Sequence, residues 1–429
     1  MVKNINRFYF ATIISLSFLW FGAVVAVCAA PALSPNVYLS FEDGTFAEYS
    51  LEKSTIIKTI PVTPLVGSRR KDTGLRMVSN QHQELLLSDP YEGPLLLWNS
   101  KKEIPLNELR SGCTQHKSDK AWEEIRVFLS KRKGVFYVAS NCNYFTGGGE
   151  DSSNETEVST VFTLRKHSAL TGVREILRKE YPACKCSTGA CSESCAKGVV
   201  EVPGGIFDSK FILKSYVEGQ LQSTTEENLL YTFSNWRCDA GKALPTSLSV
   251  ADIAPDNTVL GGYADNACCS WVNSFSDQAV VLSSGGAGVN VYDEFQRYDN
   301  AKVDINFSVS AMSFSPSGEK FVLQITADYP YDKLIRWGAD HIGAETVDAE
   351  TSARISALAE ATPAIEIFDK VGKLIEAIPS MEGAGFAGWL GDNRILLKGK
   401  DRLVILEIST GNYSVLSVPG IVLVYVPQS

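Results

Sequence analysis

The chain has 429 residues, 45% of them hydrophobic and 21% charged, which is enough apolar material for a large folded core. Its formal charge is −9 at pH 7, and no basic stripe interrupts this acidic balance. Proteins that bind phosphate backbones gather Lys and Arg on one surface, so nucleic acid is excluded as an expected partner.

Residues 1–30 have the layout of a secretory signal peptide: two basic residues, an uncharged apolar run, then small residues. Cleavage after Ala29 or Ala32 would leave a mature chain that is secreted or periplasmic. Two alternatives stay open. The run is about long enough to be an uncleaved membrane anchor, and Cys28 resembles the lipidated residue of a bacterial lipoprotein only in part. No later stretch has the ~20 apolar residues of a membrane helix, so no transmembrane segment is expected in the mature chain.

β-forming runs alternate with turn residues in the first mature segment. Strands are predicted over 37–41, 45–49 and 55–62. Asp43-Gly44 lies between the first two, and this dipeptide is a strong hairpin signal because a type I′ turn needs positive φ.

The C-terminal part follows the same pattern. It predicts strands over 394–398, 403–407 and 413–418, a hairpin over 363–379, and a strand, turn and strand over 311–327. The last β-forming run, 421–426, is predicted to pair with 37–41 and close the fold, which would leave no exposed edge at that seam.

Two segments resemble known repeat families. Residues 313–322 read SFSPSGEKFV and resemble the strand-turn-strand of WD40-like and TolB-type β-propeller blades, and residues 37–62 resemble a YVTN-type blade. The resemblance implies an all-β protein of the exported bacterial type, a β-propeller with seven blades or with six to eight. The units recur at about 55 to 60 residues rather than the ~40 to 45 of a WD40 blade, which implies long inserts.

The middle of the chain is also rich in β-forming runs. They lie at 85–87, 125–129, 134–139, 160–164, 211–213, 280–282 and 289–292. One short helix is predicted over 351–361, inside a polar insert at 329–362. We therefore expect one propeller domain over 34–429, with that insert and a Cys-rich insert at 184–195.

Four of the ten cysteines lie within twelve residues, CKCSTGACSESC. In an oxidising compartment disulfides are the default. The candidates are Cys113, Cys142, Cys184, Cys186, Cys191, Cys195, Cys238, Cys268 and Cys269. A zinc site is the alternative, but the spacing departs from C-x₂₋₄-C and no histidine is near, so no metal ligand is assigned.

Several pairings fit these cysteines. Cys184 and Cys186 are separated by one residue and would be strained as partners, so within the cluster either 184–191 goes with 186–195, or 184–195 with 186–191. Cys113 is a candidate partner of Cys142, and Cys238 of one residue of the pair 268–269. One thiol would then stay free; a nucleophile there is the less expected alternative.

The common catalytic motifs are missing. The sequence has no G-x-S-x-G elbow and no phosphate-binding G-x-x-x-x-G-K-[ST] loop. GAGFAG at 383–388 matches G-x-G-x-x-G but leads into a strand-like run, and SSGGAGVN at 283–290 is predicted to be a turn. The four histidines have no metal-type spacing and are expected to face solvent or to be hydrogen-bonded.

Acidic segments offer only weak ligand signals. Residues 147–157 have the composition of a Ca²⁺ loop without its spacing, so no cofactor is predicted and Ca²⁺ is the weak alternative. Acidic and aromatic residues mix at 291–300 and 328–350, which suits a carbohydrate or peptide groove and equally an exposed insert.

The leading hypothesis is an exported, non-catalytic scaffold that presents loops to a protein or glycan partner. The alternative is an enzyme of lactonase, lyase or quinoprotein type that uses loop carboxylates; a third hypothesis is a metal or redox role for the Cys cluster. Fold does not fix function. The sequence names no catalytic residue, no binding residue and no oligomeric state.

Overall fold

The computed structural model divides the chain into two compact units, 1–35 and 36–429. It describes residues 36–43, 45–60, 76–79, 84–88, 96–99, 102–104, 120–146, 156–168, 170–186, 196–202, 206–207, 210–217, 224–234, 237–239, 243–263, 278–283, 287–293, 306–328, 363–379 and 384–427. The predicted signal peptide and the polar insert at 329–362 with its predicted helix lie outside these residues.

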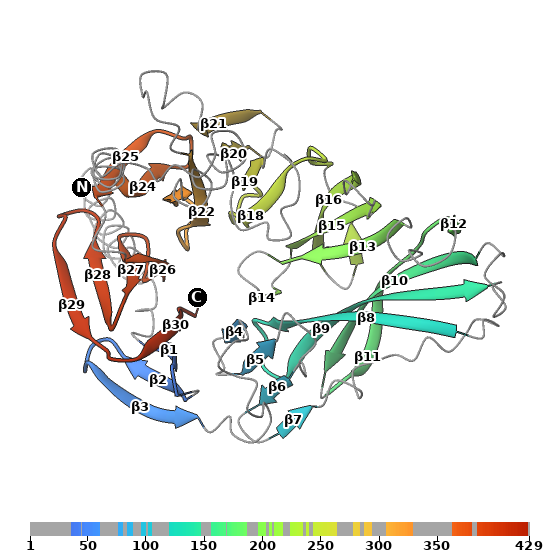
Figure 1. The fold of residues 1–429 in the computed structure, drawn as a ribbon, viewed down its shortest axis with the longest axis horizontal. Helices are drawn as coiled ribbons and strands as arrows, with labels where there is room; N and C mark the ends of the chain where they lie inside the picture. The colour runs from blue at the N-terminus through green and yellow to red at the C-terminus, as the bar shows by residue number, and fades with distance from the viewer. Residues whose placement is uncertain are drawn as a thin grey trace, which may run out of the picture. The chain divides into compact units, whose positions relative to one another are not determined.

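The described residues contain strands and no helix, and the strands form seven sheets (Figure 1). Sheet 1 contains β1 (Asn36–Phe41), β2 (Phe46–Ser50), β3 (Thr55–Ile60) and β30 (Ile421–Tyr425). Sheet 2 contains β4 (Arg76–Ser79), β5 (Leu85–Ser88), β6 (Leu96–Asn99) and β7 (Lys102–Ile104). Sheet 3 contains β8 (Lys120–Ser130), β9 (Val135–Thr146), β10 (Thr156–Ser168), β11 (Gly172–Glu180), β12 (Cys184–Cys186) and β14 (Ile206–Phe207).

The other four sheets have four strands each. Sheet 4 contains β13 (Ala196–Glu201), β15 (Lys210–Val217), β16 (Thr224–Ser234) and β17 (Arg237–Asp239). Sheet 5 contains β18 (Ser249–Ile253), β19 (Val259–Tyr263), β20 (Gln278–Leu282) and β21 (Gly288–Asp293). Sheet 6 contains β22 (Asn306–Phe314), β23 (Lys320–Asp328), β24 (Pro363–Asp369) and β25 (Leu374–Pro379), and sheet 7 contains β26 (Gly385–Trp389), β27 (Arg394–Gly399), β28 (Arg402–Glu407) and β29 (Tyr413–Ser417).

Local turn chemistry explains the hairpins. Between β1 and β2, the Phe41 N–H donates to the Thr45 carbonyl at 2.9 Å, and the Thr45 N–H donates to Asp43 Oδ1 at 2.8 Å. Between β24 and β25, Gly372 has φ of 88°, a conformation that glycine adopts at little cost. The antiparallel hairpins predicted at both ends of the described chain are confirmed.

The first sheet is completed by the last strand. β30 pairs antiparallel with β1, with Tyr38 opposite Tyr425 and Leu39 opposite Val424. The predicted seam between the two ends of the chain is confirmed. Pairing of this kind covers main-chain groups that an open edge would leave exposed.

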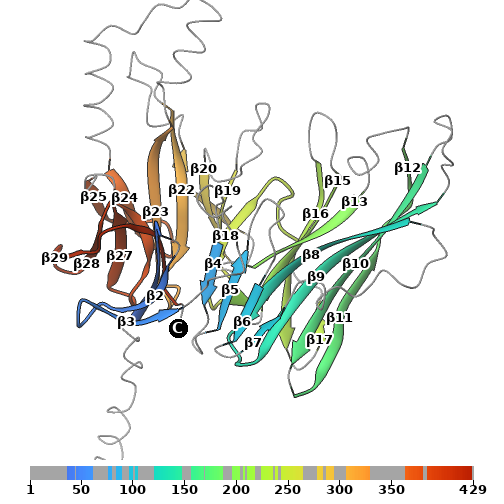
Figure 2. The same ribbon diagram turned by 60° about the horizontal axis from the view of Figure 1, so that its bottom comes forward.

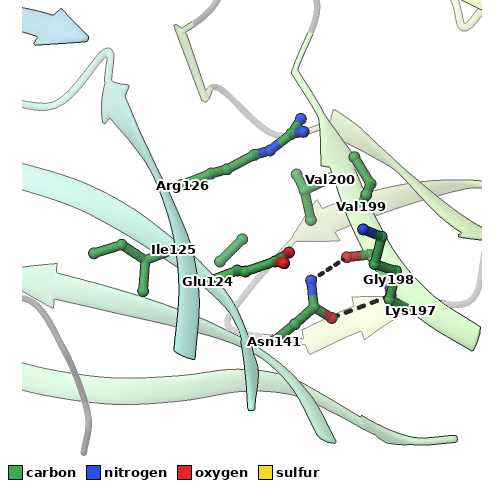
Figure 3. Close-up of a pocket in the computed structure, with 9 residues that line it drawn as sticks. Glu124, Ile125, Arg126, Asn141, Lys197, Gly198, Val199 and Val200 are labelled. Carbon is green, nitrogen blue, oxygen red and sulfur yellow. Dashed lines mark hydrogen bonds between the residues drawn. The ribbon is translucent and has the colours of Figure 1, made fainter. Parts of the chain in front are cut away.

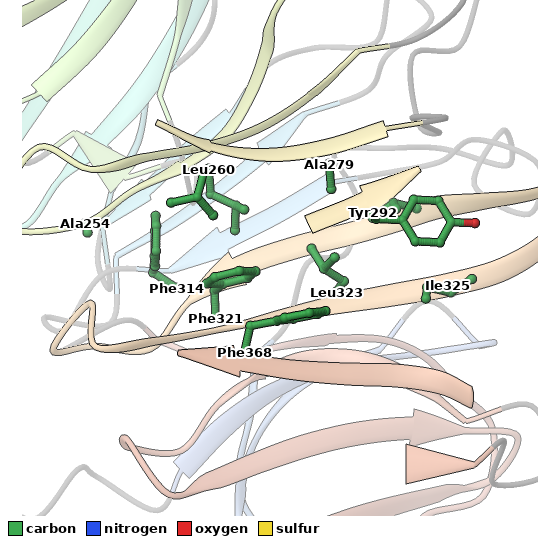
Figure 4. Packing of buried hydrophobic residues seen from close by; sticks show 11 residues of the cluster. Ala254, Leu260, Ala279, Tyr292, Phe314, Phe321, Leu323, Ile325 and Phe368 are labelled. Carbon is green, nitrogen blue, oxygen red and sulfur yellow. The ribbon is translucent and has the colours of Figure 1, made fainter. Parts of the chain in front are cut away.

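Consecutive sheets pack face to face through shared hydrophobic clusters. Figure 4 shows the cluster between sheets 5 and 6, where Phe321 stacks on Phe368 with ring centroids 5.1 Å apart. Similar clusters join sheets 2 to 3, 3 to 4, 4 to 5, 6 to 7 and 7 to 1. Because β30 of sheet 1 also lies against β4 of sheet 2, the order of sheets closes on itself.

The chain is an all-β β-propeller. Seven sheets are described, while the number of blades in the whole chain stays a prediction, since long stretches lie outside the described residues. No helix in the part of the chain that the structure describes is long and apolar enough to cross a membrane.

Sheet 3 is the exception in size. Its strands β8, β9 and β10 have 11, 12 and 13 residues and form a long twisted ribbon (Figure 2), extending well beyond the strands predicted there. Two short strands widen it: β12 pairs with β10, and β14 pairs in parallel with β8, with Ile206 opposite Leu129. The residues of β14 belong to the connection between β13 and β15 of sheet 4, so this strand ties the two sheets together.

Candidate functional site

The two ends of the sheets carry different connections. In a four-stranded antiparallel sheet, the connections from the first to the second strand and from the third to the fourth lie at one end, which we name the turn end. The remaining connections lie at the other, the loop end. Each connection longer than ten residues begins and ends at the loop end: 61–75, 105–119, 181–195, 264–277, 294–305 and 329–362.

Contacts between neighbouring sheets tie the turn end together. Lys210 Nζ donates to the main-chain carbonyls of Ala254 and Pro255, both at 2.8 Å. In the same way the Ser317 N–H donates to Asp392 Oδ1 at 2.9 Å, and Lys320 Nζ donates to Asn393 Oδ1 at 2.6 Å. These bonds link sheets 4 to 5 and 6 to 7, so this end of the molecule is braced by its own short turns.

A cavity of about 240 Å³ lies between sheets 3 and 4. It is lined by Glu124, Ile125 and Arg126 of β8, Ala139 and Asn141 of β9, and Lys197, Gly198, Val199 and Val200 of β13 (Figure 3). β13 starts at the loop end, and Lys197 and Gly198 are its second and third residues. The cavity therefore lies toward the end with the long connections.

The floor of the cavity is fixed by one buried amide. Asn141 Nδ2 donates to the Gly198 carbonyl at 2.7 Å, and the Gly198 N–H donates to Asn141 Oδ1 at 3.1 Å. A Cβ at position 198 would lie 2.8 Å from Tyr181 Oη and 2.9 Å from the Phe162 ring, so only glycine fits. Asn141 thus takes the place of a neighbouring strand and holds β13 against sheet 3.

A second polar group supports β13 from behind. Ser215 lies opposite Gly198 in the strand pairing, and its Oγ is 2.9 Å from Tyr181 Oη and 3.0 Å from Lys179 Nζ. A serine beside a lysine is a pattern found in nucleophilic catalysis. Here Ser215 is 2% exposed and does not line the cavity, so its bonds serve packing.

Two side chains of opposite charge project into this space. Glu124 and Arg126 extend from β8 toward β13, whereas Ile125 points the other way (Figure 3). Both charged residues are exposed, and neither forms an ion pair or a hydrogen bond with the described residues. Lys197 adds a second cationic residue to the lining.

Three carboxylates that do not line the cavity have partners of their own. Glu84 Oε1 accepts the Gly134 N–H at 2.7 Å, and Glu123 forms an ion pair with Arg165 at 3.4 Å. Asp252 accepts hydrogen bonds from Ile253, Ser313 and Phe314. Glu124 is the one carboxylate among the residues that line the cavity, so the carboxylate pair that the enzyme hypothesis needs does not come together there.

The disulfide candidates are only partly described. Cys142 lies in β9 and Cys184 in β12, and both are disulfide-bonded. Cys186 and Cys238 lie in β12 and β17. Cys113, Cys191, Cys195, Cys268 and Cys269 lie outside the described residues, and the pairing of all nine stays a prediction. The residues that the structure describes contain no group of ligands arranged to hold a metal ion.

The two Gly-rich segments and one of the four histidines lie partly or wholly in the described residues. Residues 385–388 of the Gly-rich match lie in β26, and the Ser283 N–H donates to the Ala287 carbonyl at 2.9 Å between β20 and β21, while residues 284–286 lie outside the described residues. His167 was expected to face solvent or to be bonded. It stacks on Phe136 at 4.7 Å instead, and burial, followed by the Arg165 charge, lowers its pKa to about 4.

The remaining sequence signals lie largely outside the described residues. The acidic loop is described only at 156–157, and the acidic and aromatic stretches only at 291–293 and 328. His82, His116 and His341 also lie outside them. Their predicted roles stay predictions.

Comparison with known proteins gives a fold-level likeness only. No protein-family model matches the chain, and no curated protein has a matching sequence. Among solved structures it is similar to apo AztD from Citrobacter koseri, with 8% identity and a TM-score of 0.43 over 91% of this chain and 96% of that one.

Two further structures cover most of the chain. The dihydro-heme d1 dehydrogenase NirN in complex with DHE has 12% identity and a TM-score of 0.40 over 93% of this chain and 76% of that one. The WD40 domain of SCAP from fission yeast has 10% identity and a TM-score of 0.29 over 90% and 87%. Such values carry no conclusion about activity or ligand, and the fold assignment above rests on strand order.

Sequence reasoning did not single out the cavity residues. One signal was present: the strand-like run before Ser130 reads KAWEEIRVFLS, with Glu124 and Arg126 two residues apart. Residues spaced by two share one face of a strand. Nothing in the sequence shows that this face meets Gly198, because that meeting depends on how two sheets pack.

Proposed function

We propose that the chain is an exported, non-catalytic β-propeller scaffold that binds a protein or glycan partner at its loop end. The observation that carries the proposal is the contrast between the two ends. The long connections are anchored at the loop end, and short mutually bonded turns form the other end.

General physical reasoning supports this assignment. Binding residues are found disproportionately on connections that a rigid scaffold positions. The hydrogen bonds between neighbouring sheets at the turn end hold the scaffold together, and the connections longer than ten residues begin and end at the loop end. The acidic charge directs the choice of partner away from nucleic acid, and export rests on the N-terminal pattern.

The test places a photo-crosslinking amino acid at one of two matched positions in sheet 7. Lys400 lies in the turn between β27 and β28, at the loop end, and Thr410 lies in the turn between β28 and β29, at the turn end. Both are exposed and are separated by a single strand. In producing cells, irradiation should yield a covalent protein adduct from position 400 and none from position 410.

A glycan array probed with the purified exported chain covers the second class of partner. Binding to the array that is lost when connections at the loop end are shortened would assign the partner to glycans. Equal adducts from both positions, or no adduct together with an empty array, would contradict the proposal.

A further inference from the structure

The cavity between β8 and β13 has a chemistry of its own, which goes beyond partner binding by the long connections. We propose that it binds a small zwitterion of the α-amino acid class with a small aliphatic side chain. In this arrangement Arg126 binds the carboxylate and Glu124 binds the ammonium group.

The first support is a pair of opposite charges that do not meet. Glu124 and Arg126 are two residues apart in β8 and share one face of the strand. The same spacing occurs on β11, where Arg178 Nη2 and Glu180 Oε1 form an ion pair at 3.0 Å. On β8 the two side chains form no ion pair, so guanidinium donors and carboxylate acceptors both stay available in one cavity.

The charged residues of the lining limit which charges a ligand can carry. The lining contains two cationic residues, Arg126 and Lys197, and one anionic residue, Glu124. A simple cation would be repelled by Arg126, and a simple anion would be repelled by Glu124. A ligand with one carboxylate and one ammonium group pairs with both kinds of side chain.

The walls limit the size and character of the rest of the ligand. Ala139, Val199 and Val200 contribute apolar surface, and no aromatic ring belongs to the lining. Aromatic faces are what sugars stack on, so their absence among these residues disfavours a saccharide. At about 240 Å³ the cavity is smaller than the ~300–1,000 Å³ of sites for drug-sized ligands, which suits a single small amino acid.

Main-chain groups complete the site. Because Asn141 bonds both the N–H and the carbonyl of Gly198, these groups point away from β15 toward the open edge of β13. Strand alternation directs the main-chain N–H and carbonyl of Val200 to the same edge. The Gly198 groups are bonded by Asn141, and the main-chain N–H and carbonyl of Val200 can bond the carboxylate and ammonium of a bound zwitterion.

The experiment is titration calorimetry of the purified mature chain with three matched probes. L-alanine carries both charges, L-alaninamide lacks the carboxylate, and L-lactate lacks the ammonium group. We expect saturable binding of alanine and at least tenfold weaker binding of each analogue. No saturable binding of alanine, or equal binding of all three probes, would overturn the proposal.

Variants assign the two charges. Arg126→Gln should weaken alanine at least tenfold and remove its advantage over alaninamide, and Glu124→Gln should do the same and remove its advantage over lactate. Both side chains are exposed and unbonded, so the thermal midpoint should stay within 1–2 °C or so of the parent. The matched control is Arg178→Gln with Glu180→Gln on β11, which should leave alanine binding unchanged.

A double variant that exchanges the two charges tests the assignment in a second way. The double variant Glu124→Arg with Arg126→Glu keeps both groups in the cavity with their places reversed. It should recover part of the alanine affinity lost in either single variant. Alanine binding that persists in both single variants, or that the β11 control also abolishes, would overturn the assignment of the site.

Discussion

At two junctions between neighbouring sheets, a polar side chain of one sheet bonds to the main chain of the next, but the side chain differs. Between sheets 3 and 4, the Asn141 amide bonds both the N–H and the carbonyl of Gly198. Between sheets 5 and 6, the Asp252 carboxylate accepts from the Phe314 N–H at 2.7 Å and the Ser313 hydroxyl at 3.1 Å. Both junctions contain a hydrophobic cluster, which includes Phe162 and Phe211 in the first and Phe321 and Phe368 in the second, and the first junction also borders the cavity.

The difference follows from what each group can do. An amide both donates and accepts, so the Asn141 side chain bonds the N–H and the carbonyl of Gly198 alone. A carboxylate only accepts, and Asp252 accepts from Ile253 in its own strand and from Ser313 and Phe314 of β22. The junction held by Asn141 borders the cavity in which we propose that a zwitterion binds, while the Asp252 carboxylate joins β18 to β22.

The largest expected loss in the free energy of unfolding comes from removing the Asp252 carboxylate. Asp252→Ala leaves the donors of Ile253, Ser313 and Phe314 without their acceptor inside the junction. The free energy of unfolding should fall by about 3 kcal/mol, measured by urea denaturation. The control is Asp256→Ala in the neighbouring exposed turn, which should cost much less; equal losses would show that the junction is not special.

Removing the neutral Asn141 side chain should reduce the free energy of unfolding by less than removing Asp252. Asn141→Ala removes two hydrogen bonds and leaves the buried main chain of Gly198 unpaired. We expect a loss of about 2 kcal/mol in the free energy of unfolding by the same measurement. A loss as large as that of Asp252→Ala would erase the distinction between the two junctions.

The smallest expected effect is a difference in pH dependence. Burial of the carboxylate raises the pKa of Asp252, although hydrogen bonds from Phe314, Ile253 and Ser313 oppose this. Unfolding then releases a proton, so stability from this residue grows as the pH falls from 7 toward the ordinary value of 3.8. The stability of the parent relative to Asp252→Asn should rise over that range in denaturation at several pH values.

Asp256 provides a control of opposite sign. The Thr258 N–H donates to its carboxylate and, as the largest cause, lowers the pKa of Asp256. Its contribution is present above the ordinary value and is lost as the pH falls through the lowered one. The parent should therefore lose stability relative to Asp256→Asn in acid. The same sign for both residues would contradict the difference in environment.

Features that depend on neighbouring residues could be predicted from the sequence. Asp43 in the first turn and Gly372 in a later one act within their own hairpins, so their positions identified the strands on either side. The seam between β1 and β30 could also be predicted, because two β-forming runs remained at the ends of a chain of hairpins.

The candidate site could not be predicted in the same way. Asn141, Gly198 and Arg126 come from strands of two sheets, and their meeting depends on packing between those sheets. The length of β8 to β10 was also underestimated, because polar residues such as Glu123 and Arg165 interrupt the apolar pattern. In the structure these two pair with each other inside the sheet.

The pairing of β1 with β30 determines when sheet 1 can be completed during synthesis of the chain. Residues 36–60 are synthesised long before residues 421–425, which complete their sheet. A nascent chain can form hairpins during its synthesis, but sheet 1 cannot be completed until residues 421–425 have emerged. Such late, non-local pairing is slow to form. An unfinished or truncated chain therefore stays open, with one edge of its first sheet bare.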